Sequence, residues 1–290
     1  MDQNSNEQEI LTLSLAITNT ISAIGCIFII LAYVTMKKDL FSIRLVVYMS
    51  IADLIHSLCL IISPLSSVWC LIQSILLEFS SSSSILWSAI MAFAIFQAVI
   101  KSDDYVERKE KAFVIIGYII PLILTCLPLS TNSYGYTQGW CWIKSDNQDF
   151  IWRLLCFYMI LLCVIIYNFV VYWIVYKKIR NEVINAIVDE EAQNINKDLL
   201  NRLRFYPIIL LVCYSAVTVK RVYEFFNPEG GERMLTWVSG LMISLLGLLN
   251  SIVYGLSKDI REHLKQMVCK RQSRDFKKFS SLEGNRNINP

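Results

Sequence analysis

The chain contains recurring apolar runs, and their length is the feature that most limits what it can fold into. A helix rises about 1.5 Å per residue, so about 20 apolar residues are needed to cross the hydrocarbon core of a bilayer. Seven runs of about this length follow one another, at 10–34, 45–66, 68–100, 112–129, 150–176, 205–226 and 234–256. A hydrophobic content of 55% is also high for a soluble domain. The sequence therefore predicts an all-α membrane protein, a bundle of seven transmembrane helices.

The distribution of lysine and arginine predicts how this bundle is oriented, because cytoplasmic connections carry an excess of basic residues. Basic residues gather in the connections after the first, third and fifth runs, at Lys37, Lys38, Arg44, Lys101, Arg108, Lys109, Lys111, Lys177, Lys178, Arg180, Lys197, Arg202 and Arg204. The opposite connections carry almost none. We therefore expect a multi-pass protein of the plasma membrane, with a short extracellular N-terminus at 1–9, a transmembrane domain at 10–257 and a cytosolic C-terminus.

The segment after the seventh run has a different pattern. Between 258 and 270, apolar residues recur at helical spacing with basic residues around them. This pattern predicts an amphipathic juxtamembrane helix on the inner leaflet. Cys269 is a candidate for palmitoylation, and the sequence leaves open whether it is modified. The polar residues 271–290 are expected to form a disordered cytosolic tail.

Two of the nine cysteines fall on the expected outer side. Cys70 begins the third run, and Cys141 lies in the stretch GWCWI at 139–143, between the fourth and fifth runs. Extracellular space is oxidising, so we expect a Cys70–Cys141 disulfide that ties this loop across the mouth of the bundle. If the stretch is extended, Trp140 and Trp142 share one face and Cys141 occupies the other.

Polar side chains inside apolar runs are costly, so each is a candidate functional residue. Asp53 in the second run and Asn250 in the seventh lie at comparable depth, and Asn19 lies near the middle of the first. They could share one buried polar cluster with a water molecule or a sodium ion. The alternative is that each makes an interhelical hydrogen bond that only holds the bundle together, which we favour for Asn19.

A second polar group lies nearer the outer end of the bundle. Its members are Glu78 in the third run, Arg153 at the start of the fifth, and Lys220 and Arg221 near the end of the sixth. With Trp142 they make a candidate ligand site, because arginine pairs well with carboxylate or phosphate. Two alternatives stay open: the basic side chains extend to water, or Lys220 pairs with Glu224 four residues later.

These residues together resemble the slime-mould cyclic AMP receptor family, a group of seven-helix G-protein-coupled receptors. The matches are Trp140-Cys141-Trp142-Ile143 with Pro121-Leu122-Ile123 before it, Arg153 with Phe157-Tyr158 after it, and Cys70, Trp87, Lys101 and Arg221 at matching intervals. Asn250-Ser251-Ile252-Val253-Tyr254 is similar to the Asn-Pro-x-x-Tyr element of rhodopsin-like receptors, without its proline. The resemblance covers roughly residues 20 to 265.

The resemblance implies a receptor that senses an extracellular small molecule and activates a heterotrimeric G protein through the cytosolic ends of spans 3, 5 and 6. The implied G-protein contacts are Lys101, Lys178, Arg202 and Arg204, and the implied buried polar switch is Asn19, Asp53, Asn250 and Tyr254. No Asp-Arg-Tyr follows the third run, so an arginine-based lock is not carried over. The loop after Trp142 is longer than in the slime-mould receptors, so cyclic AMP is not implied, and a small anion is the candidate ligand.

Other classes of membrane protein fit the sequence less well. A retinal protein needs a lysine in its last span, and 234–256 contains none. A zinc enzyme is disfavoured because the two histidines, His56 and His263, fall in different compartments. We therefore expect no enzymatic activity and no cofactor. We also expect no nucleic-acid partner, since the basic residues line one membrane face and suit contact with anionic lipid. A small transporter remains the alternative, although no internal repeat is visible.

Overall fold

The computed structural model describes residues 2–36, 41–62, 66–101, 106–137, 140–144, 149–185, 205–227 and 233–255, with positions 261 and 265. The first three helices are α1 (Asp2–Thr35), α2 (Phe41–Ile61) and α3 (Ser67–Ile100). A fourth rod runs through η1 (Val106–Lys109), α4 (Glu110–Val114), η2 (Ile115–Ile119), α5 (Ile120–Cys126) and η3 (Leu127–Thr131). A fifth consists of α6 (Phe150–Arg153), η4 (Leu154–Tyr158) and α7 (Met159–Asn185), and is followed by α9 (Phe205–Phe226), α10 (Arg233–Ser244) and α11 (Leu246–Gly255).

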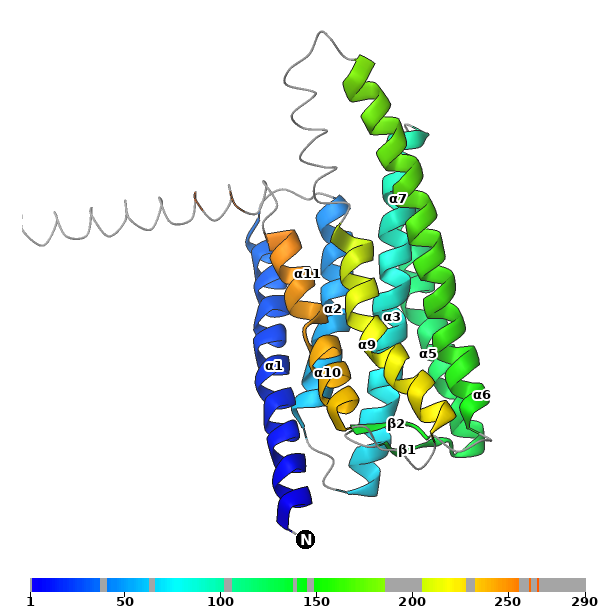
Figure 1. The fold of residues 1–290 in the computed structure, drawn as a ribbon. Helices are drawn as coiled ribbons and strands as arrows, with labels where there is room; N and C mark the ends of the chain where they lie inside the picture. The colour runs from blue at the N-terminus through cyan, green and yellow to red at the C-terminus, as the bar shows by residue number, and fades with distance from the viewer. Residues whose placement is uncertain are drawn as a thin grey trace, which may run out of the picture.

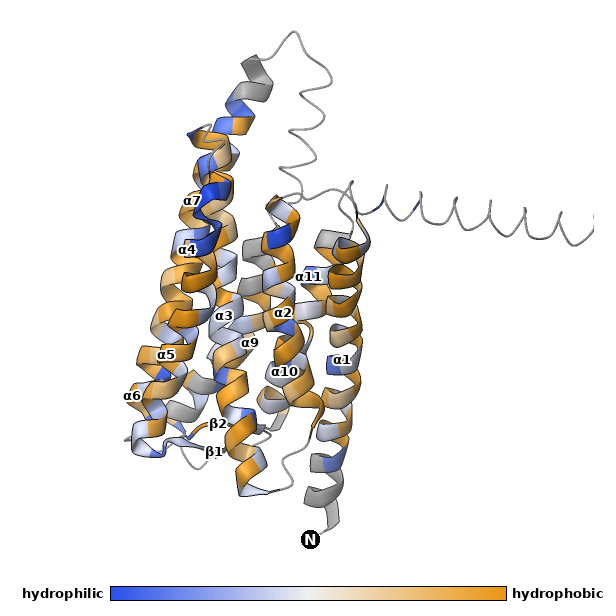
Figure 2. Cartoon of the chain, turned by 180° about the vertical axis from the view of Figure 1, so that it is seen from behind, coloured by the Kyte–Doolittle hydropathy of each residue, from blue (hydrophilic) through white to orange (hydrophobic). Residues whose placement is uncertain are grey.

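These helices pack side by side into one elongated bundle (Figure 1). A two-stranded hairpin, β1 (Tyr134–Thr137) and β2 (Trp140–Ile143), crosses the end of the bundle at which α1 begins (Figure 1). We call this the hairpin end, and the opposite end, towards which α7 extends, the far end. Apolar residues predominate along the helices (Figure 2), and many of their outward side chains are exposed in the isolated chain, as at Ile24, Phe169 and Trp173.

Six helices are long and apolar enough to cross a membrane: Glu9–Thr35, Phe41–Ile61, Ser67–Ile100, Val106–Thr131, Phe150–Asn181 and Met234–Val253. Six of the seven expected runs are therefore confirmed as candidate spans. The remaining run, at 205–226, coincides with the 22-residue α9, but its described apolar part is only Leu211–Lys220. A seventh crossing stays a prediction.

Two details add to the expected architecture. The chain is not entirely helical, because β1 and β2 form an antiparallel pair in which Tyr136 faces Cys141 and Thr137 faces Trp140. The stretch 140–143 is thus extended, which was the condition for Trp140 and Trp142 to share one face, and its pairing with β1 is the addition. At the N-terminus, α1 already begins at Asp2, so the segment expected to precede the first span is a helical extension of it.

The expected helix at 258–270, Cys269 and the tail 271–290 lie outside the described residues, apart from the helical positions Arg261 and Lys265.

Prolines shape the fourth rod and direct the chain into the hairpin. Proline lacks a backbone donor and weakens the helix before it, and a π-helical turn, η2, precedes Pro121. Pro128 lies in the 3-10 turn η3, which ends at Asn132 with φ 52°, a left-handed cap that reverses the chain. The Tyr134 hydroxyl then donates to the Thr125 carbonyl at 2.8 Å, which fastens β1 to α5.

The fourth rod approaches α3 closely because a glycine faces a tryptophan. A Cβ added to Gly117 would lie 2.5 Å from the ring of Trp87, so only glycine fits there. Trp87 is fully buried and packs against the rings of Tyr48 and Tyr118. Next to it, the Ser83 hydroxyl donates to the Gly117 carbonyl at 2.7 Å. This hydrogen bond therefore joins α3 directly to η2 of the fourth rod.

Candidate functional site

The hairpin is tied to α3 by the predicted disulfide, which the structure confirms. Cys70 in the first turn of α3 is bonded to Cys141 in the middle of β2. One turn further along α3, the Gln73 side chain accepts a hydrogen bond from the Cys141 backbone N–H at 2.9 Å. Its amide nitrogen donates to the carbonyls of Cys59 and Ile62, at 2.8 and 3.0 Å. Gln73 therefore joins the end of α2, the start of α3 and the hairpin.

Gln73 was not among the residues that the sequence pointed to. The available signal was its position: a polar side chain inside an apolar run, three residues after the bridging cysteine and hence on the same face of the helix. Its partners are backbone groups, which no pattern of side-chain types reveals.

Trp142 connects the hairpin to the buried carboxylate of α3. Its indole Nε1 donates to Glu78 Oε2 at 2.7 Å, and the Ser82 hydroxyl donates to Oε1 of the same carboxylate at 3.2 Å. Glu78 is fully buried, so these bonds satisfy a group that would otherwise be costly to enclose. The ring of Trp142 also meets Phe157 edge-on, with 5.2 Å between the centroids.

Arg153 is buried and directed at the end of β2. Its guanidinium donates to the Ile143 carbonyl through Nε at 2.8 Å and through a terminal nitrogen. Its central carbon lies 5.3 Å from the centroid of the Trp142 ring. The structure thus brings Glu78, Trp142 and Arg153 together, with the indole between the carboxylate and the guanidinium.

Lys220 lies on the other tryptophan of the hairpin. It is buried on α9, and its ammonium nitrogen is 4.8 Å from the centroid of the Trp140 ring. A cation over an aromatic face at this distance is attractive, and more so when both groups are shielded from water. Arg221 follows on the same helix, but its side chain lies outside the described part of the structure. Glu78, Arg153 and Lys220 therefore converge on the two indoles, one of which is the predicted ligand residue Trp142.

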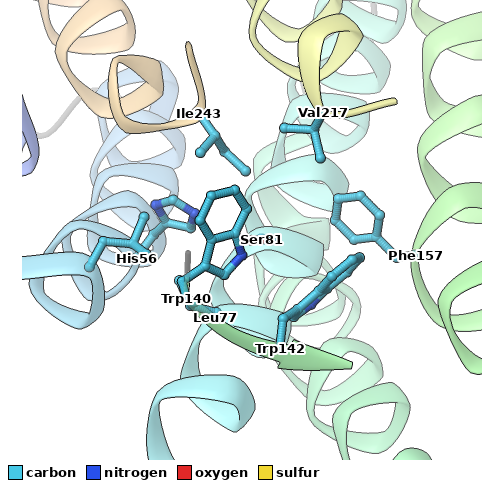
Figure 3. Close-up of a pocket in the computed structure, with 9 residues that line it drawn as sticks. His56, Leu77, Ser81, Trp140, Trp142, Phe157, Val217 and Ile243 are labelled. Carbon is cyan, nitrogen blue, oxygen red and sulfur yellow. The ribbon is translucent and has the colours of Figure 1, made fainter. Parts of the chain in front are cut away.

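A small cavity remains beneath the hairpin. Its volume is about 30 Å³, which leaves room for a few water molecules, whereas pockets for small molecules usually enclose roughly 300 to 1,000 Å³. Side chains from α2, α3, α9, α10, η4 and the hairpin line it, among them His56, Ser81, Phe157, Trp140 and Trp142 (Figure 3). The cavity between the indoles and the helices is therefore too small for a small-molecule ligand in the present arrangement.

A second buried cluster lies deeper, around Asp53. The Ser84 hydroxyl donates to Asp53 Oδ1 at 2.6 Å, and the Asn250 amide donates to Oδ2 at 2.8 Å. Asp53 thereby joins α2 to α3 and α11. Gly247 lets α11 pack tightly against this cluster, since a Cβ there would lie 2.6 Å from the Ser22 hydroxyl oxygen and 3.3 Å from the Asp53 Cβ. Ser22 is buried, and its hydroxyl has no hydrogen-bond partner among the described residues.

The other two residues of the expected switch are placed differently. The Asn19 amide donates to the Ser244 hydroxyl at 2.7 Å and to the Leu15 carbonyl at 2.8 Å, which joins α1 to α10. This is the separate interhelical bond that we favoured for Asn19. Tyr254 lies in the last turn of α11, and its side chain is outside the described part of the structure.

At the far end, an ion-pair network joins α2 to the start of the fourth rod. The Arg44 guanidinium donates to Glu110 at 2.9 Å and to Glu107 at 2.5 Å, and the Tyr48 hydroxyl donates to Glu110 at 2.7 Å. The sequence had suggested Arg44 only as a marker of orientation. Sequence alone does not show that the two acidic residues in the next connection face it.

The expected G-protein contacts are only partly described. Lys101 is exposed and caps the end of α3, and Lys178 lies on the long extension of α7. The long extension of α7 reaches towards the far end of the bundle (Figure 1). Arg202 and Arg204 lie outside the described residues.

Comparison with known proteins gives this arrangement a context. A family model described as slime mold cyclic AMP receptor matches residues 2–250. The chain is similar to "G-protein coupled receptor 1" of Arabidopsis thaliana, with 29% identity over 258 residues that cover 86% of this chain and 78% of the relative. It is similar to "Cyclic AMP receptor-like protein A" of Dictyostelium discoideum, with 25% identity over 279 residues that cover 91% and 71%. A shorter match to "G-protein coupled receptor 157" of Homo sapiens has 26% identity and covers 39% and 37%.

Proposed function

The chain belongs to the slime mold cyclic AMP receptor family, and from that premise we propose that it is a G-protein-coupled receptor of the plasma membrane. In this proposal α9 is the sixth of seven crossings, the hairpin end is extracellular, and the far end and tail are cytosolic. The support for this orientation is the concentration of basic residues in the far-end connections. Activation of a heterotrimeric G protein is then the expected output, and no enzymatic step or cofactor is required.

The observation that carries the proposal is the reach of the tethered hairpin. Through Glu78, Arg153 and Lys220 its two tryptophans contact α3, α6 and α9 at once. A molecule that changes the position of this hairpin therefore changes the packing of three membrane helices together. That is how a ligand at one end of a bundle can favour one of two helix arrangements.

The ligand that we propose is a small anion, bound by Arg153, Lys220 and Arg221 with Glu78 and Trp142 at the rim of the site. In the present arrangement Arg153 holds the Ile143 carbonyl and Lys220 covers Trp140. An anion that draws these cations to itself would release their hold on β2. Shifting a two-state equilibrium from 1:99 to 99:1 requires roughly a 10⁴-fold preference for one state, which several charge-assisted contacts can supply.

Between the two ends we propose that Asp53, Asn250 and Tyr254 act as the polar switch, while Asn19 serves packing. Asp53 has hydroxyl oxygens of Ser84 and Ser22 nearby, and oxygen donors of this kind suit a small hard cation such as sodium or a water molecule. The G protein would then meet Lys101, Lys178, Arg202 and Arg204 at the far end.

The proposal is tested by nucleotide exchange on a purified heterotrimeric G protein, with the receptor in nanodiscs and a panel of small anions. We expect exchange to rise with at least one anion, and Arg221→Ala to weaken that response without lowering surface expression. An equal response in the variant and the parent would remove Arg221 from the site. Uptake of a solute into sealed vesicles, with no exchange on any Gα subtype, would instead indicate a transporter.

A further inference from the structure

Resting on the proposed receptor function, we infer that Trp140 is a tethered occupant of the ligand site, and that its indole fills a slot for a planar aromatic ligand. The ligand class is a ring system of about the size of indole that carries one hydrogen-bonding substituent. This goes beyond the anion contacts above, because it assigns the apolar part of the ligand and the position it takes.

The first observation is where the Trp140 ring lies. It leaves β2 and points into the bundle, between His56 and Trp142 (Figure 3). On its far side a Cβ added to Gly240 would lie 3.3 Å from the ring carbon Cζ3, so the ring packs directly against the backbone of α10. The ammonium of Lys220 lies 4.8 Å from the ring centroid. A loop side chain therefore occupies a space walled by α2, α9 and α10.

The second observation is a polar side chain directed at this space. His56 is 4% exposed and lines the cavity beside Trp140, and among the described residues nothing forms a hydrogen bond with its imidazole. Such a group is unfavourable in a protein interior unless water or a ligand satisfies it. The Ser81 hydroxyl lines the same cavity. A substituent on a ring in the slot would reach these two groups, which an indole without substituents does not use.

The third observation is that the slot can be vacated without undoing the hairpin. The neighbouring residue Cys141 is fixed by its disulfide and by the hydrogen bond from its N–H to Gln73. Because the backbone beside Trp140 is held in this way, we infer that the slot opens by rotation of the Trp140 side chain while the strand stays in place. The opened space is the volume of the indole together with the adjoining cavity of about 30 Å³. The site would thus admit a ring slightly larger than indole.

The test is chemical replacement of the missing side chain. We expect Trp140→Ala, in nanodiscs, to have a lower melting temperature than the parent. We also expect this variant to bind free indole saturably, and the bound indole to restore part of the lost melting temperature. The parent should show no such binding, because its slot is filled. Trp173→Ala is the matched control, since Trp173 lies on α7 and is 62% exposed on the outer surface, so it reports only partition of indole into lipid. Lys220→Met in the Trp140→Ala background should weaken indole binding roughly ten-fold, through loss of the cation over the ring.

Several outcomes would overturn the inference. Folded Trp140→Ala that binds indole no better than Trp173→Ala would show that no slot exists. If Trp140→Ala does not fold, Trp140→Leu is measured in the same way, because leucine keeps part of the apolar contact while leaving room for a ring, and its failure to bind would count equally. Because these readouts do not involve a G protein, indole binding without nucleotide exchange supports the slot and contradicts the receptor proposal. Nucleotide exchange without indole binding supports the receptor proposal and contradicts the slot.

Discussion

Replacement of Gln73 by leucine tests whether the hairpin is held by hydrogen bonds as well as by its disulfide. The substitution removes one accepted bond, from the Cys141 N–H, and two donated bonds, to the Cys59 and Ile62 carbonyls. A neutral hydrogen bond contributes about 1 kcal/mol net, and a buried donor left without an acceptor costs about 1–3 kcal/mol. We therefore expect Gln73→Leu to lower the free energy of unfolding by about 3 kcal/mol.

The assay is labelling of buried thiols during unfolding in detergent micelles. Cys156 and Cys213 are buried in the folded protein and become reactive only when it opens. The exposed Cys126 and Cys163 and the tail Cys269 are first replaced by serine, so that the signal reports unfolding alone.

The matched control is Gln97→Leu on the same helix. Gln97 is also buried, but its Oε1 has no hydrogen-bond partner among the described residues. Removing it should leave the stability unchanged or slightly raised. Equal losses in the two variants would mean that the Gln73 bonds contribute nothing beyond ordinary packing, and the reasoning would be wrong.

Three further variants test other parts of the fold and switch. Gly117→Ala places a Cβ 2.5 Å from the Trp87 ring and should destabilise the protein by about 1–3 kcal/mol. Gly135→Ala is the control and should not destabilise it, because the added Cβ meets only a flexible lysine side chain. Equal melting temperatures of these two variants would contradict the account. Asp53→Asn should remove any difference in activation between sodium and potassium series, and a retained sodium effect would return this residue to a packing role. Glu110→Gln weakens the ion-pair network at the far end, by about 1 kcal/mol for a partly exposed pair. This variant should raise basal nucleotide exchange. Unchanged basal exchange would show that the network does not restrain the far end.

Much of the helical architecture could be predicted because hydropathy reports the surroundings of each residue directly. A run long enough to cross the bilayer has few alternatives to a helix, since the lipid satisfies no backbone group. The pairing of Cys70 with Cys141 was predictable for a similar reason, because both fall at the same end of the bundle. For α9 the crossing stays a prediction, because side chains at both ends of this 22-residue helix lie outside the described part of the structure.

The site could be predicted only as a set of residues, not as a set of contacts. Arg153 and Lys220 were expected to face a ligand, whereas their contacts in the structure include the Ile143 carbonyl and the Trp140 ring. These partners depend on the twist of β2 and on side-chain rotamers, which tertiary packing decides. Gln73 shows the same limit, because all three of its hydrogen bonds are to backbone groups.

Labelling of both chain ends from one side of intact cells tests the central claim most directly. An epitope tag is added to each terminus of the full chain, and membrane-impermeant reagents are applied before and after permeabilisation. If α9 is a true crossing and the hairpin end is outside, the N-terminal tag is labelled on intact cells and the C-terminal tag only after permeabilisation. Labelling of both tags on intact cells, or of neither, would mean an even number of crossings and would contradict the receptor topology.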